Sequence, residues 1–172
     1  AFCRRHDVGL FIARMTALDR QALLGLQREG FVLRETLMTW QRDLGTEPGV
    51  ERDADPVVRV AGPDDADEVR RIARRAFHGY LGHYHSDPRL PEVLCDEVYG
   101  DWAWRSCQPE SGDCMFVAEA SGRIAGFGSV RLRTPTAGEA VLGGVDPDSR
   151  ERGVYLTLQR ERVRWSRARG AS

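Results

Sequence analysis

The segment AVLGGVDPDSRERGVYL, residues 140–156, contains the pattern that decides how the chain folds. Apolar and glycine residues run into an Asp-Pro turn, and the residues that follow predict a helix with Arg150 at its start and Gly153 in its first turn. The first turn of a helix leaves backbone N–H groups unpaired, and the helix dipole there favours negative charge. Gly153 has no Cβ, so an anion can approach the backbone closely, and Arg150 and Arg152 add positive charge. These features indicate a cradle for a pyrophosphate group; an ordinary helix start with surface arginines is the alternative.

Two better-known phosphate loops do not match this segment. A Walker loop requires G-x-x-x-x-G-K-[ST], whereas all 25 basic residues of this chain are arginines. The dinucleotide fingerprint requires three spaced glycines. The absence of lysine also excludes a lysine Schiff base or a lysine nucleophile within these residues.

The composition indicates a soluble protein. With 172 residues, of which 41% are hydrophobic, the chain can bury a core in one domain, or in one domain plus a small extension. A net charge of −1 gives no general attraction to nucleic acid or to a membrane surface. No apolar run approaches the roughly 18–20 residues that span a bilayer, and no signal peptide is visible. The four cysteines form no C-x-x-C pair, so we expect reduced thiols in a cytoplasmic protein.

The first part of the chain has the pattern of a small β-α-β unit. Residues 8–15 predict an apolar strand, residues 17–30 an amphipathic helix closed by Gly30, and residues 31–44 a strand of alternating polarity. Residues 45–56 are rich in glycine, proline and acids, which is typical of a linker.

A second unit occupies the rest of the chain and mixes helices with hairpin strands. Its predicted elements are a strand at 57–61, helices at 62–77 and 91–107, a β-hairpin at 114–133 turning at Ser121-Gly122, a strand at 138–145 and a helix at 154–170. This order is neither a TIM barrel nor a doubly wound sheet, since both alternate strand and helix throughout. An α/β (α+β) fold with a mixed central sheet flanked by helices is expected.

Three segments in this order resemble the GCN5-related N-acetyltransferase (GNAT) superfamily: AGPDDADEVRRIARRAF, MFVAEASGRIAGFGSVRL and GEAVLGGVDPDSRERGVY. The resemblance covers about residues 57–170. The signature of the superfamily is [Q/R]-x-x-G-x-[G/A] at a helix start, and here it reads Arg150-Glu151-Arg152-Gly153-Val154-Tyr155. Tyr155 replaces the final small residue, which we expect to narrow the cradle.

The resemblance implies acetyl-CoA as the co-substrate, without a metal. The backbone of the signature would hold the coenzyme A pyrophosphate, and the pantetheine arm would pair with the open edge of the strand that contains Gly143. A backbone N–H at Gly144 or Val145 would polarise the thioester carbonyl. The implied cofactor-binding residues are Gly143, Gly144, Val145, Arg150, Glu151, Arg152, Gly153, Val154 and Tyr155.

Acetyl transfer also needs a base for the amine and an acid for the thiolate. We take Glu139 as the general base, with Glu119, His83 and His85 as the other candidates. In the superfamily the acid is usually a tyrosine beyond the next strand. We therefore expect the protein to continue past residue 172, or another segment to take the place of that strand.

Residues 1–44 are similar to the C-terminal half of such a domain. The superfamily pattern N-x-x-A-x-x-x-Y-x-x-x-G-F aligns with residues 19–31, but Leu26 stands where the tyrosine would be. We interpret residues 1–44 as a degenerate GNAT-like half-domain, residues 45–56 as a linker, and residues 57–172 as a GNAT domain that is incomplete at its C-terminus. The branch that acts on nucleotide-linked amino sugars carries a partial N-terminal domain of this kind.

The segment HGYLGHYHSDPRLP, residues 78–91, contains H-x-H-x-D and would suit a metal, but no third ligand from another element stands out. In the superfamily the equivalent segment forms a wall of the acceptor site. We therefore expect His83, Tyr84 and His85 to contact the acceptor. A loop that these residues merely order is the alternative.

These patterns together predict an acetyl-CoA-dependent N-acetyltransferase for a primary amine of a small molecule, such as a nucleotide-linked amino sugar. A non-catalytic acyl-CoA-binding module and a protein or peptide N-acetyltransferase are the alternatives. The expected partner is a small-molecule amine, with no nucleic acid and no membrane, and a homodimer is one possible assembly. The arginines of the last helix, residues 154–170, are interpreted as a solvated face.

Overall fold

The structure is a computed structural model that describes residues 2–44, 56–80 and 82–172. The chain divides into two compact units, Ala1–Leu37 and Met38–Ser172. Apart from Pro56, the linker predicted at residues 45–56 lies outside the described residues.

The first unit contains two helices, α1 (Phe2–Arg5) and α2 (Arg20–Arg28). Asp19 caps α2, because its side chain accepts a hydrogen bond from the backbone N–H of Ala22 at 3.0 Å. The helix ends before Gly30, which adopts a left-handed φ of +84°. The helix predicted at residues 17–30 is confirmed.

The strands predicted on either side of α2 are wrong. Residues 8–15 and 31–44 have no strand in the structure. An alternating pattern makes a strand stable only where a neighbouring strand shares its backbone hydrogen bonds, and the described part of this unit offers none. That residues 1–44 are a degenerate half-domain therefore remains a prediction.

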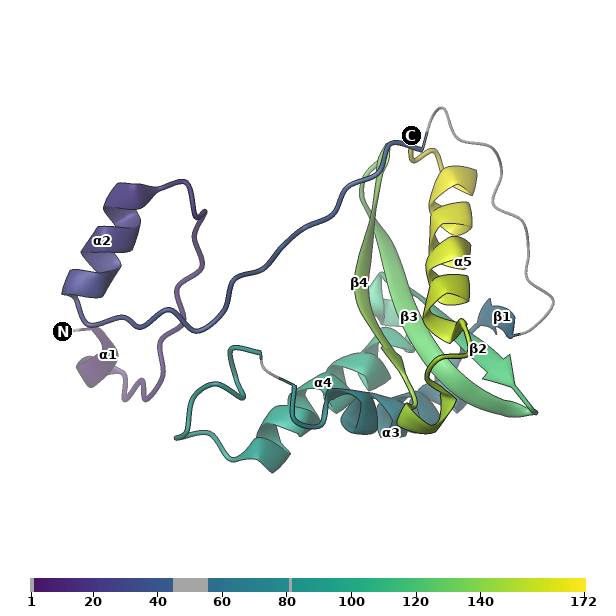
Figure 1. The fold of residues 1–172 in the computed structure, drawn as a ribbon, viewed down its shortest axis with the longest axis horizontal. Helices are drawn as coiled ribbons and strands as arrows, with labels where there is room; N and C mark the ends of the chain where they lie inside the picture. Colours follow the sequence, from purple (N-terminus) through teal and green to yellow (C-terminus); the bar gives the residue numbers. More distant parts are fainter. Residues whose placement is uncertain (1, 45–55, 81) are drawn as a thin grey trace. The chain divides into compact units, whose positions relative to one another are not determined.

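The second unit is built on a four-stranded antiparallel sheet of order β1-β2-β3-β4 (Figure 1). The strands are β1 (Val57–Val60), β2 (Cys114–Ala120), β3 (Arg123–Thr134) and β4 (Ala137–Val145). Ser121 and Gly122 both have positive φ, as a two-residue hairpin turn requires. Among the described residues β4 pairs with β3 alone, so its outer edge is open.

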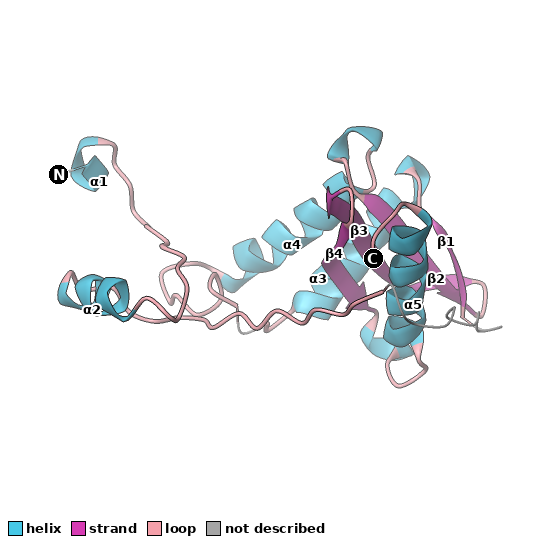
Figure 2. Cartoon of the chain, turned by 90° about the horizontal axis from the view of Figure 1, so that it is seen from above, coloured by secondary structure: helices cyan, strands magenta, loops and turns pink. Residues whose placement is uncertain are grey.

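Helices cover both faces of this sheet. Helices α3 (Ala66–Phe77) and α4 (Glu92–Ser106) pack on one face, and α5 (Val154–Ala168) packs on the other (Figures 1 and 2). Short 3₁₀ turns precede α3, follow α4 and follow β4, at Pro63–Asp65, Pro109–Ser111 and Pro147–Ser149. Every element predicted for residues 57–170 is confirmed, to within a few residues at the ends. None of the helices in the described ranges is long and apolar enough to cross a membrane.

The two faces have separate cores because side chains alternate along β2. Met115 and Val117 join the cluster under α3 and α4, which also includes Phe127. Phe116 and Ala118 join the cluster under α5. The sheet therefore has an apolar core on each face, and β4 is its edge strand.

The α3 core provides a test of this packing. Ile72 is fully buried on α3, so Ile72→Val should lower the free energy of unfolding by about 0.5–1.5 kcal/mol through the lost methyl group and the cavity it leaves. Val93→Ala, at an exposed position of α4, is the control and should change it by less than about 0.5 kcal/mol. Urea denaturation measures both, and equal losses would contradict the assignment of this core.

Candidate active site

The loop between β4 and α5 contains two residues with a left-handed backbone. Glu151 and Gly153 both have left-handed φ, of +64° and +73°. Left-handed residues next to a turn make concave groups of N–H donors that bind anions. A Cβ built on Gly153 would meet nothing within 4 Å, so the space in front of it is open.

The first turn of α5 has no side-chain cap. Gly153 is the N-cap residue and no side chain accepts from the amides that follow it, so the amides of the first turn stay available to an external anion. Arg150 and Arg152 are exposed beside this turn, and the structure pairs neither with a carboxylate among the residues it describes. The predicted cradle thus has its donors, its charge and its open space together.

Tyr155 does not narrow the cradle. Its hydroxyl accepts a hydrogen bond from the Gln159 side chain at 2.8 Å, and its ring lies 5.7 Å from the guanidinium carbon of Arg162. Both partners lie further along α5, so the ring leans away from the first-turn amides. The expectation that Tyr155 restricts this space is wrong, because the side chain packs along the helix.

Asp146 holds the loop against α3. Its carboxylate is almost completely buried, with 7% of the side chain exposed, and lies 2.8 Å from Arg75 and 3.2 Å from Arg71. It also accepts from the backbone N–H of Asp148 at 3.0 Å. Burial raises the pKa of this carboxyl, but the Asp148 hydrogen bond and the two arginines outweigh burial and lower the pKa below 3.8.

The open edge of β4 presents alternate amides. Asp146 donates its N–H to Ala125 of β3 at 2.9 Å, and Leu142 donates to a β3 hydroxyl at 3.2 Å. Because backbone groups alternate in direction along a strand, the amides of Gly143 and Val145 face the edge where no described strand pairs. The amide of Gly144, by the same alternation, lies on the β3 side.

A β-bulge interrupts β4 just before these glycines. Gly143 pairs with Gly128 and Ala140 pairs with Val130, so the two residues Val141 and Leu142 lie opposite one residue of β3. Bulges of this kind bend a strand and redirect its edge, and they occur next to active sites. The bulge therefore lies one residue before the glycine pair.

The glycine pair allows close packing on both faces of the sheet. A Cβ on Gly143 would lie 3.2 Å from the Arg162 guanidinium of α5, and a Cβ on Gly144 would lie 3.0 Å from Ala76 of α3. Both glycines thus bring helices close to β4, while the edge of the strand stays open.

Arg162 is a buried cation with no carboxylate partner among the described residues. The residue is 3% exposed, its Nη1 donates to the carbonyls of Ser129 and Leu142 at 3.4 Å, and its Nε and Nη2 have no partner. Burial lowers its pKa. The guanidinium supports the bulge through Leu142. The interpretation of the arginines of α5 as a solvated face is therefore wrong for Arg162, because the sheet covers its side chain.

Glu139 lies before the bulge on β4. Its carboxylate binds Arg131 and Arg133 at 3.1 Å each, so both oxygens are held in place. Glu119 lies on β2 instead, where it binds Arg59 at 2.7 Å.

The histidine segment is divided between two environments. His83 packs against Tyr84, with ring centroids 4.1 Å apart, whereas the Nε2 atom of His85 binds Asp96 of α4 at 2.8 Å. In the described ranges no three His, Cys, Asp or Glu side chains are grouped as a metal site would require. Asp96 was missed by the sequence reasoning, because only the fold brings α4 beside the loop.

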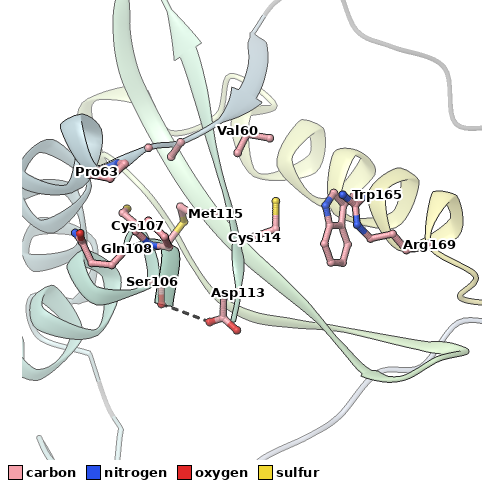
Figure 3. A pocket seen from close by; sticks show the side chains of 13 residues that line it. Val60, Pro63, Ser106, Cys107, Gln108, Asp113, Cys114, Met115, Trp165 and Arg169 are labelled. Atoms are coloured by element: carbon pink, nitrogen blue, oxygen red, sulfur yellow. Dashed lines mark hydrogen bonds between the residues drawn. The ribbon is translucent and has the colours of Figure 1, made fainter. Parts of the chain in front are cut away.

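A pocket of about 260 Å³ lies at the other end of α5 (Figure 3). Trp165 lines it, about 18 Å from Gly153 along the helix axis by the rise of about 1.5 Å per residue. Burial raises the pKa of Cys107 to about 12 and also raises that of Cys114, so both thiols in the pocket are protonated at neutral pH. The pocket is therefore separate from the phosphate cradle and offers no thiolate nucleophile.

The fold is that of the GCN5-related N-acetyltransferases. A solved GCN5-related N-acetyltransferase from Rhodopseudomonas palustris matches with a TM-score of 0.53 and 23% identity, covering 72% of both chains. A Pyrococcus horikoshii protein described as an acetyltransferase matches with a TM-score of 0.53 and 18% identity, covering 67% of this chain and 76% of its own. The GNAT resemblance is thus confirmed for the fold.

The sequence is similar to two curated proteins called mycothiol acetyltransferase. They come from Mycobacterium sp. strains MCS and JLS and are 31% and 30% identical over 137 residues, which is 78% of this chain. The match covers 41% of the length of each relative. No protein-family model matches the sequence. Neither relative is named for a nucleotide-linked amino sugar, so that branch stays a prediction.

The Asp146 contacts give a prediction for the loop. Asp146→Asn should lower the free energy of unfolding by about 1–3 kcal/mol, because two arginines lose their shared partner. Because the folded-state pKa is depressed, the contribution of Asp146 is complete above about pH 4 and is lost as the pH falls through the lowered value. Urea denaturation of both proteins at pH 7 and at pH 3 measures this difference in the free energy of unfolding.

Asp148→Asn is the matched control, since Asp148 shares Arg75 but is exposed. It should change the free energy of unfolding by no more than about 0.5 kcal/mol. An equal effect of both substitutions, or an Asp146 effect that is unchanged at pH 3, would contradict the bracing of the loop.

Proposed function

We propose that the chain carries the donor half of an acetyl-CoA-dependent N-acetyltransferase that acts on a primary amine of a small molecule. One observation carries the proposal: an uncapped helix start with open amides lies directly after a strand whose edge is open. A pyrophosphate and an extended arm fit that combination, because the first needs converging N–H donors and the second needs unpaired backbone groups.

Different residues bind different parts of the acetyl-CoA donor. The amides of residues 151–154 bind the pyrophosphate, and Arg150 and Arg152 supply charge beside it. Gly143 and Val145 pair with the pantetheine arm through the edge of β4. A backbone N–H from this edge, with Val145 as the candidate, polarises the thioester carbonyl so that negative charge is stabilised as the amine attacks.

Glu139 is the proposed general base. It lies on the same strand as the donor edge, beyond the bulge, and Arg131 and Arg133 hold its carboxylate. An amine is protonated at neutral pH, so the carboxylate takes one proton, directly or through water, before the amine attacks the thioester carbon. The C–S bond then breaks to release the thiolate, and the attacking nitrogen loses its second proton, which balances the charge of the thiolate, to leave the neutral amide.

The acceptor is proposed from the two sequence relatives, whose name connects them with mycothiol. An amine of the mycothiol system is therefore the first acceptor to test, and a nucleotide-linked amino sugar is the second. The segment containing His83, Tyr84 and His85 forms the proposed acceptor wall.

Coenzyme A binding tests the donor site. The complete protein should bind acetyl-CoA in isothermal titration calorimetry, and Gly153→Glu should reduce the affinity at least 100-fold. The new carboxylate would fill the open space before the first-turn amides and repel the pyrophosphate. The positive φ of Gly153 also disfavours any side chain there.

Gly112→Glu is the matched control, because Gly112 has the same φ of +73° and the same empty surroundings. It imposes the same backbone strain away from the proposed cradle, and acetyl-CoA affinity should be unchanged. Retained affinity in Gly153→Glu, or an equal loss in both variants, would place the donor elsewhere.

Thiol release distinguishes an enzyme from an acyl-CoA-binding module. The protein is mixed with acetyl-CoA and a panel of an amine of the mycothiol system, a nucleotide-linked amino sugar and an N-terminal peptide. Glu139→Gln should lower kcat/KM by about 10²–10⁴-fold through loss of the base, whereas Glu119→Gln should leave it within about twofold. Binding without thiol release would favour the module, and a larger loss in Glu119→Gln would move the base to β2.

A further inference from the structure

One carboxylate on α4 binds two histidines from the segment that follows α3. Asp96 Oδ1 lies 2.8 Å from Nε2 of His85, and Asp96 Oδ2 lies 3.0 Å from Nδ1 of His78. The Asp96 side chain is 14% exposed, so both contacts form at a partly desolvated carboxylate. Charge-assisted hydrogen bonds of this kind are among the stronger ones in proteins.

His85 is enclosed, and the hydrogen bonds define its tautomer. Its side chain is 5% exposed, its ring is stacked 6.0 Å from that of Tyr99, and the Tyr80 ring meets it edge-on. Because Nε2 faces a carboxylate, that atom carries a proton and donates it. Nδ1 is buried and has no hydrogen-bond partner among the described residues, so a proton there would have no acceptor.

The same aromatic rings lead from His85 to the donor strand. Tyr99 stacks on Phe77 at the end of α3, with centroids 4.4 Å apart. Ala76, which precedes Phe77 in α3, packs against Gly144 of β4, because a Cβ on Gly144 would lie only 3.0 Å from the Ala76 methyl group. A displacement of His85 therefore reaches the donor strand through directly packed groups.

We propose that Asp96 is the positioning residue of the acceptor wall: its carboxylate fastens residues 82–87 to α4 by binding His85 and His78. This inference rests on the proposed function for the role of that wall, but the fastening itself does not. Both carboxylate oxygens of Asp96 are taken up by the histidines, so no direct role toward substrate is proposed for it. It acts through His85, whose fixed ring sets the position of the segment with His83 and Tyr84 on α4.

His78 gives the fastening a pH dependence. The hydrogen bond to Asp96, together with the charges of Asp96 and Glu92, raises the pKa of His78. Protonated His78 attracts Asp96. The contribution of this ion pair to the fastening is therefore complete below about pH 6.5 and is lost as the pH rises through the raised pKa of His78. The titratable groups that face the pair are Tyr80, Glu92, Cys95 and Tyr99.

Hydrogen exchange on the complete protein tests the fastening without any ligand. Asp96→Ala should lower the protection factors of the amides of Ser86 and Asp87, which bond within the segment, at least 10-fold. Asp96→Asn keeps an acceptor for His85, so it should restore most of the protection and remove the dependence on pH between 6 and 8.

Asp101→Ala is the matched control, since Asp101 is an exposed acid of the same helix that binds Arg70. It should leave Ser86 and Asp87 unchanged. Unchanged protection in Asp96→Ala would overturn the proposal, and so would an equal loss in Asp101→Ala, which would show only a weakened α4.

A spectroscopic and a kinetic measurement separate positioning from general stability. The ¹⁵N shifts of His85 should show a proton on Nε2 and an unprotonated Nδ1 in the unaltered protein, and a mixture of tautomers in Asp96→Ala.

The kinetic measurement uses the amine of the panel above that has the highest turnover. Asp96→Ala should raise the KM for this amine at least 10-fold and leave the affinity for acetyl-CoA unchanged. A protonated Nδ1 in the unaltered protein, or a fall in kcat alone, would overturn the proposal. If the unaltered protein transfers no acetyl group, the proposed function fails while exchange and the ¹⁵N shifts still decide the fastening.

Discussion

The buried carboxylate of Asp146 is the constraint on which the proposed donor site depends. The backbone N–H of Asp146 makes the last bond from β4 to β3, and its carboxylate caps the 3₁₀ turn that follows and binds Arg71 and Arg75 of α3. Without it the loop to α5 keeps only the exposed contact between Asp148 and Arg75 on the α3 side. Because the loop is fixed, its amides can converge before an anion arrives, and binding then loses less conformational entropy.

A second constraint is that helices approach β4 closely on both faces while its edge remains open. Arg162 occupies the space beside Gly143 from the α5 side, and Ala76 occupies the space beside Gly144 from the α3 side. A Cβ at either position would require the neighbouring side chain to shift by a few tenths of an ångström. The bulge at Val141 and Leu142 lies between this packed region and Glu139. The strand thus joins the proposed donor edge to the proposed base.

The sequence predicted the second unit well because local signals there agree with the tertiary structure: periodicity placed α3 and α5, and Ser121-Gly122 placed the hairpin. It failed at residues 8–15 and 31–44, where strand patterns lack pairing partners in the described unit. The loop around Gly153 was predictable, since its amides depend on local geometry. Asp96 and Arg162 were not, because their partners lie on other elements and only packing brings them together.

The central claim is that the backbone from Glu151 to Val154, together with the edge amides of β4, binds coenzyme A. Amide chemical-shift mapping in a ¹H–¹⁵N spectrum during titration with coenzyme A tests it most directly. We expect the largest shifts at residues 150–155, with further shifts at Gly143 and Val145 and none in the pocket around Trp165. Shifts centred on that pocket, with the residues around Gly153 unmoved, would contradict it.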